Sequence, residues 1–96
     1  MIDYRYLLPA EVELTEAALF YEEQFTGLGM DYLDDIQRCI DRIRSHPEIG
    51  QIIQGNTRRS QVSRFPYSIL YTIENDHILI IAVAHNRRNP FYWKER

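Results

Sequence analysis

Residues 67–86, YSILYTIENDHILIIAVAHN, decide the fold. β-branched and aromatic residues dominate this stretch, and Asn75-Asp76 divides it as a two-residue hairpin turn would. In Tyr67–Glu74, apolar and polar side chains alternate, which predicts a strand with one buried face. His77–Asn86 is apolar at both parities, so we expect a central strand that is covered on both sides. The stretch therefore predicts a β-hairpin at the centre of a sheet.

Two amphipathic helices are expected before this hairpin, over about residues 10–26 and 30–45, with Gly27-Leu28-Gly29 between them. Pro9 suits the first turn of a helix, and Pro47 ends the second one. The expected buried stripes are Leu14, Ala18, Tyr21 and Phe25 in the first helix, and Leu33, Ile36, Ile40 and Ile43 in the second, with Cys39 beside them as a small buried hydrophobe. Together the two helices predict an αα-hairpin with an apolar face to bury.

The rest of the chain adds two shorter strands, over residues 2–8 and 58–65, and a loop over residues 46–57. In that loop, Ile52-Ile53 is interpreted as a small apolar plug. The predicted fold is a single α+β domain over residues 1–96, in the order β-α-α-β-β-β. We expect a mostly antiparallel sheet with the helical hairpin packed on one face.

Composition is that of an ordinary globular protein: 45% of the 96 residues are hydrophobic and 26% are charged. The longest apolar run, Ile78–Ala84, is far shorter than the roughly 20 residues of a membrane helix. The first residues, MIDYR, do not resemble a signal peptide. One cysteine cannot form an internal disulfide. We therefore expect a soluble cytoplasmic protein that does not contact a membrane.

Charge is unevenly distributed along the chain. Residues 1–48 hold eleven acids and four arginines, for a net charge of −7. Residues 49–96 hold three acids and seven bases, for a net charge of +4, and the whole chain carries −3. All the bases except Lys94 are arginines, which bind carboxylates and phosphates in a bidentate manner and also stack on aromatic rings.

Conventional catalytic and metal sites are not indicated. His77 and His85 share a parity and a face of the expected strand, but eight residues at about 3.3 Å each keep them too far apart for one ion, and His46 has no evident partner. We expect no metal and no cofactor. The acid pairs Glu22-Glu23 and Asp34-Asp35 diverge on their helices, which indicates solvated faces rather than acid–base pairs. No nucleophile elbow or phosphate-binding glycine loop is present.

The C-terminal stretch HNRRNPFYW, residues 85–93, is the best candidate for a functional site. Its arginines suit phosphate or carboxylate recognition, and its aromatic residues suit stacking or anchoring at an interface. Alternatively, Phe91, Tyr92 and Trp93 fold back as a lid on the sheet while the arginines are solvated. Both interpretations hold if the lid is also the partner surface.

Four motifs together resemble the RelE/ParE superfamily of bacterial type II toxins, and within it the ParE-like branch of plasmid stabilisation proteins. In order, they are YEEQ and GLG (residues 21–24 and 27–29), PEIG (47–50), RFPYSILY (64–71), and AHNRR followed by Pro90, Tyr92 and Trp93. The resemblance runs from about Ala10 to Trp93. The superfamily's β-α-α-β-β-β order also agrees with the order derived from periodicity.

This resemblance implies a toxin that halts growth, is neutralised by a cognate antitoxin and forms a toxin–antitoxin hetero-oligomer. RelE-like members are ribosome-dependent mRNA endonucleases, whereas characterised ParE-like members poison DNA gyrase. A nuclease needs an acid, a base and a cation near the scissile phosphate. The paired lysines of the RelE-like enzymes have no counterpart in this chain, and their strand arginine aligns with Ser63, one step from Arg64 and hence on the opposite face of a strand. If the chain is a ribonuclease, His85, Arg87 and Tyr92 are the catalytic candidates.

The incomplete nuclease set favours a protein that binds DNA gyrase over an enzyme. In that interpretation the target-binding residues are Arg64, Arg87, Arg88, Tyr92 and Trp93. Helix-in-groove docking on the second helix and strand addition at the open sheet edge are the expected antitoxin contacts. A ribosomal target and an inactive module that only binds its antitoxin remain the alternatives.

Overall fold

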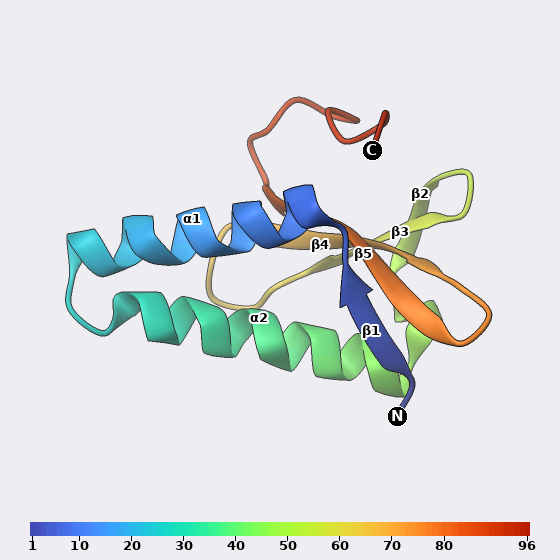
Figure 1. Cartoon of the computed structure of the whole chain (residues 1–96), viewed down its shortest axis with the longest axis horizontal. Coiled ribbons are helices and arrows are strands. Elements are labelled where there is room, and N and C mark those ends of the chain that lie inside the picture. Colours follow the sequence, from blue (N-terminus) through green and yellow to red (C-terminus); the bar gives the residue numbers. More distant parts are fainter.

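The computed structural model describes all residues 1–96. In chain order the elements are β1 (Asp3–Tyr6), α1 (Leu8–Gln24), α2 (Leu28–Ser45), a 3-10 turn (Pro47–Ile49), β2 (Gln51–Gln54), β3 (Thr57–Gln61), β4 (Tyr67–Ile73) and β5 (His77–His85). The sheet has the order β1-β5-β4-β3-β2, and only the β1–β5 pair is parallel. The helices lie side by side as a hairpin (Figure 1). The predicted fold class is confirmed. No helix combines the length and apolar character needed to cross a membrane.

The sheet contains one strand more than the sequence predicts. The segment over residues 46–57, expected to be a loop, forms the 3-10 turn and β2, which pairs antiparallel with β3 across a turn at Gly55, where φ is +55°. Ile52 is 54% exposed, so the apolar plug is wrong for that residue, whereas Ile53 packs against the sheet. Four residues without clear alternation carry too little periodicity to reveal a strand.

Glycine allows the two helices to meet closely. Gly27 has a φ of +91°, which glycine adopts without strain, and a Cβ on Gly29 would lie 2.7 Å from the Ala18 carbonyl oxygen. The Glu22 carboxylate accepts hydrogen bonds from both glycine N–H groups, at 3.0 and 3.1 Å. Glu22 is exposed, as expected for a solvated helix face, but its carboxylate also caps the N-terminus of α2.

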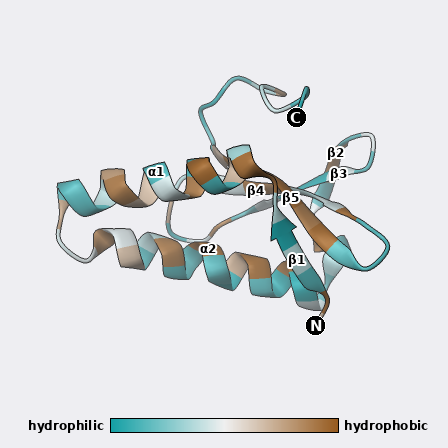
Figure 2. Cartoon of the chain, in the orientation of Figure 1, coloured by the Kyte–Doolittle hydropathy of each residue, from teal (hydrophilic) through white to brown (hydrophobic).

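The main core lies between the helices and the sheet. The predicted stripe of α2 is confirmed: Ile36, Ile40 and Ile43, with Cys39 beside them, are at most 1% exposed, and Leu33 is half-buried against the same core. Hydrophobic bands recur along both helices in Figure 2. In α1, by contrast, the predicted stripe fails at its end: Phe25 is 73% exposed because α1 stops at Gln24 and the chain turns away.

A β-bulge in β5 changes which side chains share a face. Leu70 pairs with Ala82 and Tyr71 with Ile80, so Ile81 is an extra residue on β5. As a result, Ile80 and Val83 both face the helices, whereas Ala82 faces the other side of the sheet. The predicted shared face of His77 and His85 is therefore wrong. A one-residue insertion reverses the parity of every residue beyond it.

Candidate functional site

The C-terminal segment returns over the face of the sheet that the helices leave uncovered. Trp93 is 7% exposed and packs with Leu70, Ala82 and Ala84 in a second, smaller core. Tyr92 is half-buried beside it, and Phe91 is 42% exposed. The expected lid is therefore confirmed for Trp93 and Tyr92. Because of this lid, β5 is covered on both faces, as its sequence predicts.

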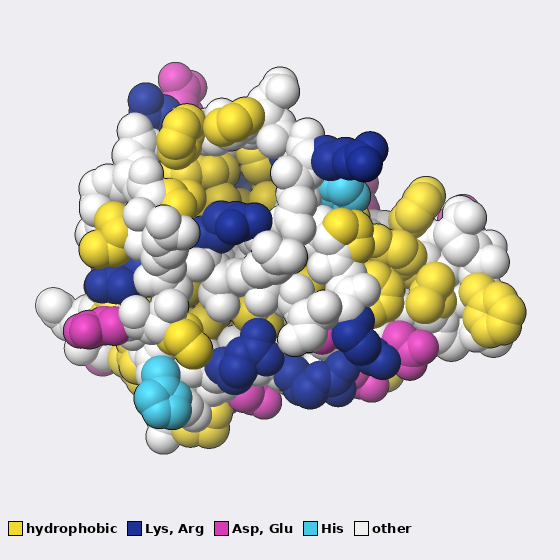
Figure 3. Space-filling model, turned by 180° about the vertical axis from the view of Figure 1, so that it is seen from behind, with side chains coloured by type: hydrophobic (Ala, Val, Ile, Leu, Met, Phe, Trp, Pro, Cys, Tyr) yellow, Lys and Arg dark blue, Asp and Glu magenta, His cyan; other side chains and the backbone are white.

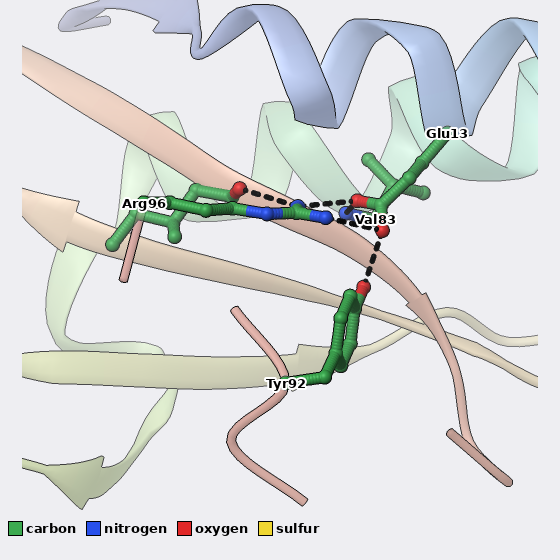
Figure 4. Close-up of polar contacts among 5 residues, drawn as sticks. Glu13, Val83, Tyr92 and Arg96 are labelled. Atoms are coloured by element: carbon green, nitrogen blue, oxygen red, sulfur yellow. Dashed lines mark hydrogen bonds and ion pairs between the residues drawn. The ribbon is translucent and has the colours of Figure 1, made fainter. Parts of the chain in front are cut away.

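A carboxylate on α1 holds this segment in place (Figure 4). Glu13 pairs with both terminal nitrogens of Arg96, at 2.7 and 2.9 Å, and accepts a hydrogen bond from the Tyr92 hydroxyl at 2.5 Å. It also accepts one from the Val83 N–H of β5 at 3.1 Å. Arg96 in turn donates to the Ile81 carbonyl at 3.1 Å. The Glu13 clasp is the name used below for these contacts of Glu13 and Arg96 with each other, with the Tyr92 hydroxyl and with the backbone of Val83 and Ile81.

The clasp occupies an otherwise bare strand edge. β1 pairs with β5 only over residues 77–80, so the outer edge of β5 has no neighbouring strand beyond Ile80. Unpaired backbone groups at such an edge need other partners. Glu13 accepts from the Val83 N–H there, and Arg96 donates to the Ile81 carbonyl. Two side chains therefore take the place of a missing strand.

The clasp also shifts the pKa values of its members. Burial alone would raise the pKa of Glu13, but hydrogen bonds from Arg96, Tyr92 and Val83 outweigh it, so the pKa lies below its usual value. Burial, followed by the bond to Glu13, raises the pKa of Tyr92. The carboxylate also raises the pKa of Arg96. These shifts favour an ionised Glu13, a protonated Arg96 and a neutral Tyr92, which are the forms that the contacts require.

Sequence reasoning missed Glu13 and Arg96. Glu13 was only one of several acids in the first turns of a helix, and nothing local links it to a residue more than eighty positions away. Its partners become evident only once β5 brings α1 and the C-terminal segment together.

Three predicted target-binding arginines lie at one end of the sheet. Arg87 and Arg88 follow β5 directly, and Arg64 lies in the connection between β3 and β4. The Asn86 N–H donates to the Pro66 carbonyl at 2.8 Å, which joins the two segments that carry them. All three are exposed, and none forms a salt bridge. The guanidinium of Arg88 lies 3.8 Å from the centre of the Tyr92 ring, a cation–π contact that orients it.

A buried carboxylate positions Arg64. Asp35 of α2 is 1% exposed, which overturns the expectation of a solvated face for this residue. It accepts a hydrogen bond from the Arg64 N–H at 2.8 Å and lies 3.7 Å from the Arg38 guanidinium. Ser63 and Arg64 both lie in a connection rather than a strand, so the expected opposition of their faces does not apply.

The remaining predicted residues have structural contacts. Trp93 is a lid residue whose ring contacts the sheet, and the Tyr92 hydroxyl is engaged by Glu13. His85 packs edge-on against the Tyr67 ring, and its Nδ1 accepts a hydrogen bond from the Arg87 N–H at 3.0 Å. No group of three or more histidine, cysteine, aspartate or glutamate side chains is placed to hold a metal ion.

Comparison with known proteins agrees with this architecture. Residues 4–90 match the family described as "ParE toxin of type II toxin-antitoxin system, parDE". A solved structure described as "Chromosomal ParDE TA system from P. aeruginosa" superposes with a TM-score of 0.77 at 15% sequence identity, covering 88% of this chain and 96% of that one. At this identity the likeness establishes the fold alone. No curated protein matches the sequence significantly.

Proposed function

Because the chain belongs to the ParE family of toxins of type II toxin–antitoxin systems, we propose that it arrests growth by binding DNA gyrase. The observation that carries this proposal is the unpaired arginine cluster of Arg64, Arg87 and Arg88 at one end of the sheet. Gyrase is the proposed target because the sequence resembles the ParE-like branch of the superfamily. The cluster supplies a surface that suits the carboxylates of a protein or the phosphates of its DNA.

The aromatic residues support this surface rather than extend it. Trp93 is too deeply buried to dock directly, so we assign it the role of fixing the segment against the sheet. The Tyr92 ring stacks under Arg88 while its hydroxyl is bound to Glu13. Pre-ordering an arginine in this way lowers the entropy lost when it binds.

The contacts at the site favour binding over ribonuclease chemistry. The Tyr92 hydroxyl already donates to a carboxylate, and its raised pKa makes it a poor acid and a poor base at neutral pH. Of the nuclease candidates, His85 and Arg87 alone keep uncommitted polar groups, too few for an acid, a base and a cation at one phosphate.

We assign the antitoxin contact to α1 rather than to α2. The apolar stripe of α2 is buried, so the helix-in-groove surface expected there is already used by the core. On α1, Leu8, Val12 and Leu19 are 46–71% exposed and lie within about 40° of one another around the helix. An amphipathic antitoxin helix would bury this stripe. β2, an uncharged edge strand, offers the second contact, by strand addition.

The test is induction of the chain without antitoxin, with pulse labelling of DNA and protein synthesis. Under the proposal DNA synthesis falls first, and purified toxin inhibits gyrase supercoiling in vitro. Arg87→Ala with Arg88→Ala should abolish both effects while antitoxin binding persists. Arg5→Ala with Arg42→Ala, which removes the same charge from exposed positions elsewhere, is the matched control.

Other outcomes would point to the other classes. Protein synthesis falling first would indicate a ribosome-dependent nuclease. If neither synthesis falls although the protein is soluble and folded, the chain is an antitoxin-binding module without toxicity. A toxic Arg87→Ala/Arg88→Ala variant would refute the site assignment.

A further inference from the structure

A cavity of about 310 Å³ lies between the sheet and the C-terminal segment, on the face away from the helices. Ile53, Leu70 and Ala84 of the sheet line it on one side, and Phe91 and Trp93 of the segment line it on the other. Seen from behind, hydrophobic side chains show through a hollow in this face, with a basic side chain beside it (Figure 3). Its volume is at the small end of the range for ligand pockets, enough for one ring and a polar group.

The polar wall of this cavity offers hydrogen-bond donors. Arg59 of β3 is half-buried, and its guanidinium contacts only two amide oxygens, those of Gln61 at 3.5 Å and Asn86 at 3.4 Å. Both contacts are long, and neither oxygen is charged. The remaining guanidinium N–H groups of Arg59 have no partner. Because an unpaired charge is costly to bury, a half-buried guanidinium without a counterion favours the binding of an anion.

Asn86 is oriented to add a further donor. Its Oδ1 accepts a 2.7 Å hydrogen bond from the hydroxyl of Ser68, a side chain on the same face that is 2% exposed, and also faces Arg59. Protein donors thus already engage this oxygen, and the amide NH₂ of Asn86 remains free to donate to a ligand. Arg88 also lines the cavity, whereas no aspartate or glutamate does.

We propose that this cavity binds a small organic anion, with a phosphate or carboxylate group at Arg59 and Asn86 and an apolar ring against Phe91 and Trp93. The oxyanion supplies the missing counterion of Arg59 and accepts from the Asn86 amide, in charge-assisted hydrogen bonds. The ring fills the apolar part of the cavity, where aromatic partners favour a planar group. This inference does not rest on the gyrase proposal, because the site is complete in the toxin alone.

The test is a titration of the purified, ¹⁵N-labelled full chain with three ligands of matched ring, followed by NMR. Phenyl phosphate and phenylacetate are the anionic probes, and phenylacetamide is the neutral one. We expect both anions to shift the amides of residues 84–93 and the Trp93 indole, with a Kd on the order of 1 mM for ligands this small. Phenylacetamide should bind about tenfold more weakly, because it lacks the charge-assisted bond. The anion that binds with the lower Kd shows whether phosphate or carboxylate is the natural group.

Two variants locate the effect. Arg59→Gln should weaken anion binding about tenfold, and Asn86→Asp should abolish it by placing a carboxylate beside Arg59. Arg5→Gln, an exposed charge change on β1, should bind as the wild type does. The proposal is overturned if phenylacetamide binds as tightly as the anions, if the shifts map outside the cavity, or if Arg59→Gln binds normally. The wild-type ligand series decides the matter even if a variant misfolds.

Discussion

Breaking the Glu13 clasp should release the C-terminal segment before the rest of the domain unfolds. Glu13→Gln keeps the shape of the side chain and one acceptor oxygen but removes the charge that pairs with Arg96. Hydrogen bonds to charged groups contribute about 1.5–3 kcal/mol. Because Glu13 and Arg96 are 14% and 17% exposed, solvent screens part of this energy. We therefore expect the substitution to cost about 1–2 kcal/mol.

The assay uses the only tryptophan of the chain. Trp93 lies in the segment that the clasp holds, so its fluorescence reports on that segment, whereas far-UV circular dichroism reports on the whole domain. In urea, the fluorescence midpoint of Glu13→Gln should fall further than its circular dichroism midpoint. Glu16→Gln, one turn along the exposed face of α1, removes the same charge and should change the free energy of unfolding by no more than about 0.5 kcal/mol in either assay.

A double-mutant cycle isolates the ion pair. Arg96→Gln should cost about as much as Glu13→Gln, and the double variant should cost about 1 kcal/mol less than the two together. Equal effects of Glu13→Gln and Glu16→Gln, or a coupling energy near zero, would refute the clasp.

Three further measurements test other parts of the structure. Because the pKa of Glu13 is lowered in the folded state, its contribution to stability is complete above the ordinary value of 4.5 and is lost as the pH falls through the folded-state pKa. Trp93 emission should therefore shift to the red on acidification below pH 4.5. This shift should be absent in Glu13→Gln. Gly50→Ala would place a Cβ 2.5 Å from the Tyr71 hydroxyl oxygen, and urea unfolding should show a loss of roughly 1–3 kcal/mol; wild-type stability would contradict this packing. Ile40→Ala should cost about 2–5 kcal/mol in the same assay, because the side chain is 1% exposed, and a smaller loss would mean that α2 packs less tightly.

Elements with strong local periodicity were predictable. The stripe of Ile36, Ile40 and Ile43 repeats at the helical period over two turns, so its buried face follows from sequence alone. The hairpin of β4 and β5 was equally predictable, because its alternating side chains and its turn residues are adjacent in the chain. β2 was missed because a four-residue edge strand depends on its pairing with β3 rather than on its own pattern.

The candidate site was only partly predictable. Arg64, Arg87 and Arg88 were predicted as binding residues from the sequence, and all three are exposed as expected. The burial of Asp35 was not foreseen, because its role is to bind a backbone N–H that lies 29 positions away in sequence. Side chains that satisfy distant backbone groups leave no periodic signal.

The order of local patterns along the chain was enough to establish the α+β class, the helical hairpin and the arginine-rich end of the last strand, because each depends on residues within a few turns of one another. Three features required the tertiary structure: the bulge at Ile81, the clasp of Glu13 with Arg96, and the donor-lined cavity at Arg59. The bulge depends on the register between two strands, and the other two on segments that meet only after the sheet has formed. Such contacts follow from where the folded backbone leaves a donor, an edge or a cavity unfilled.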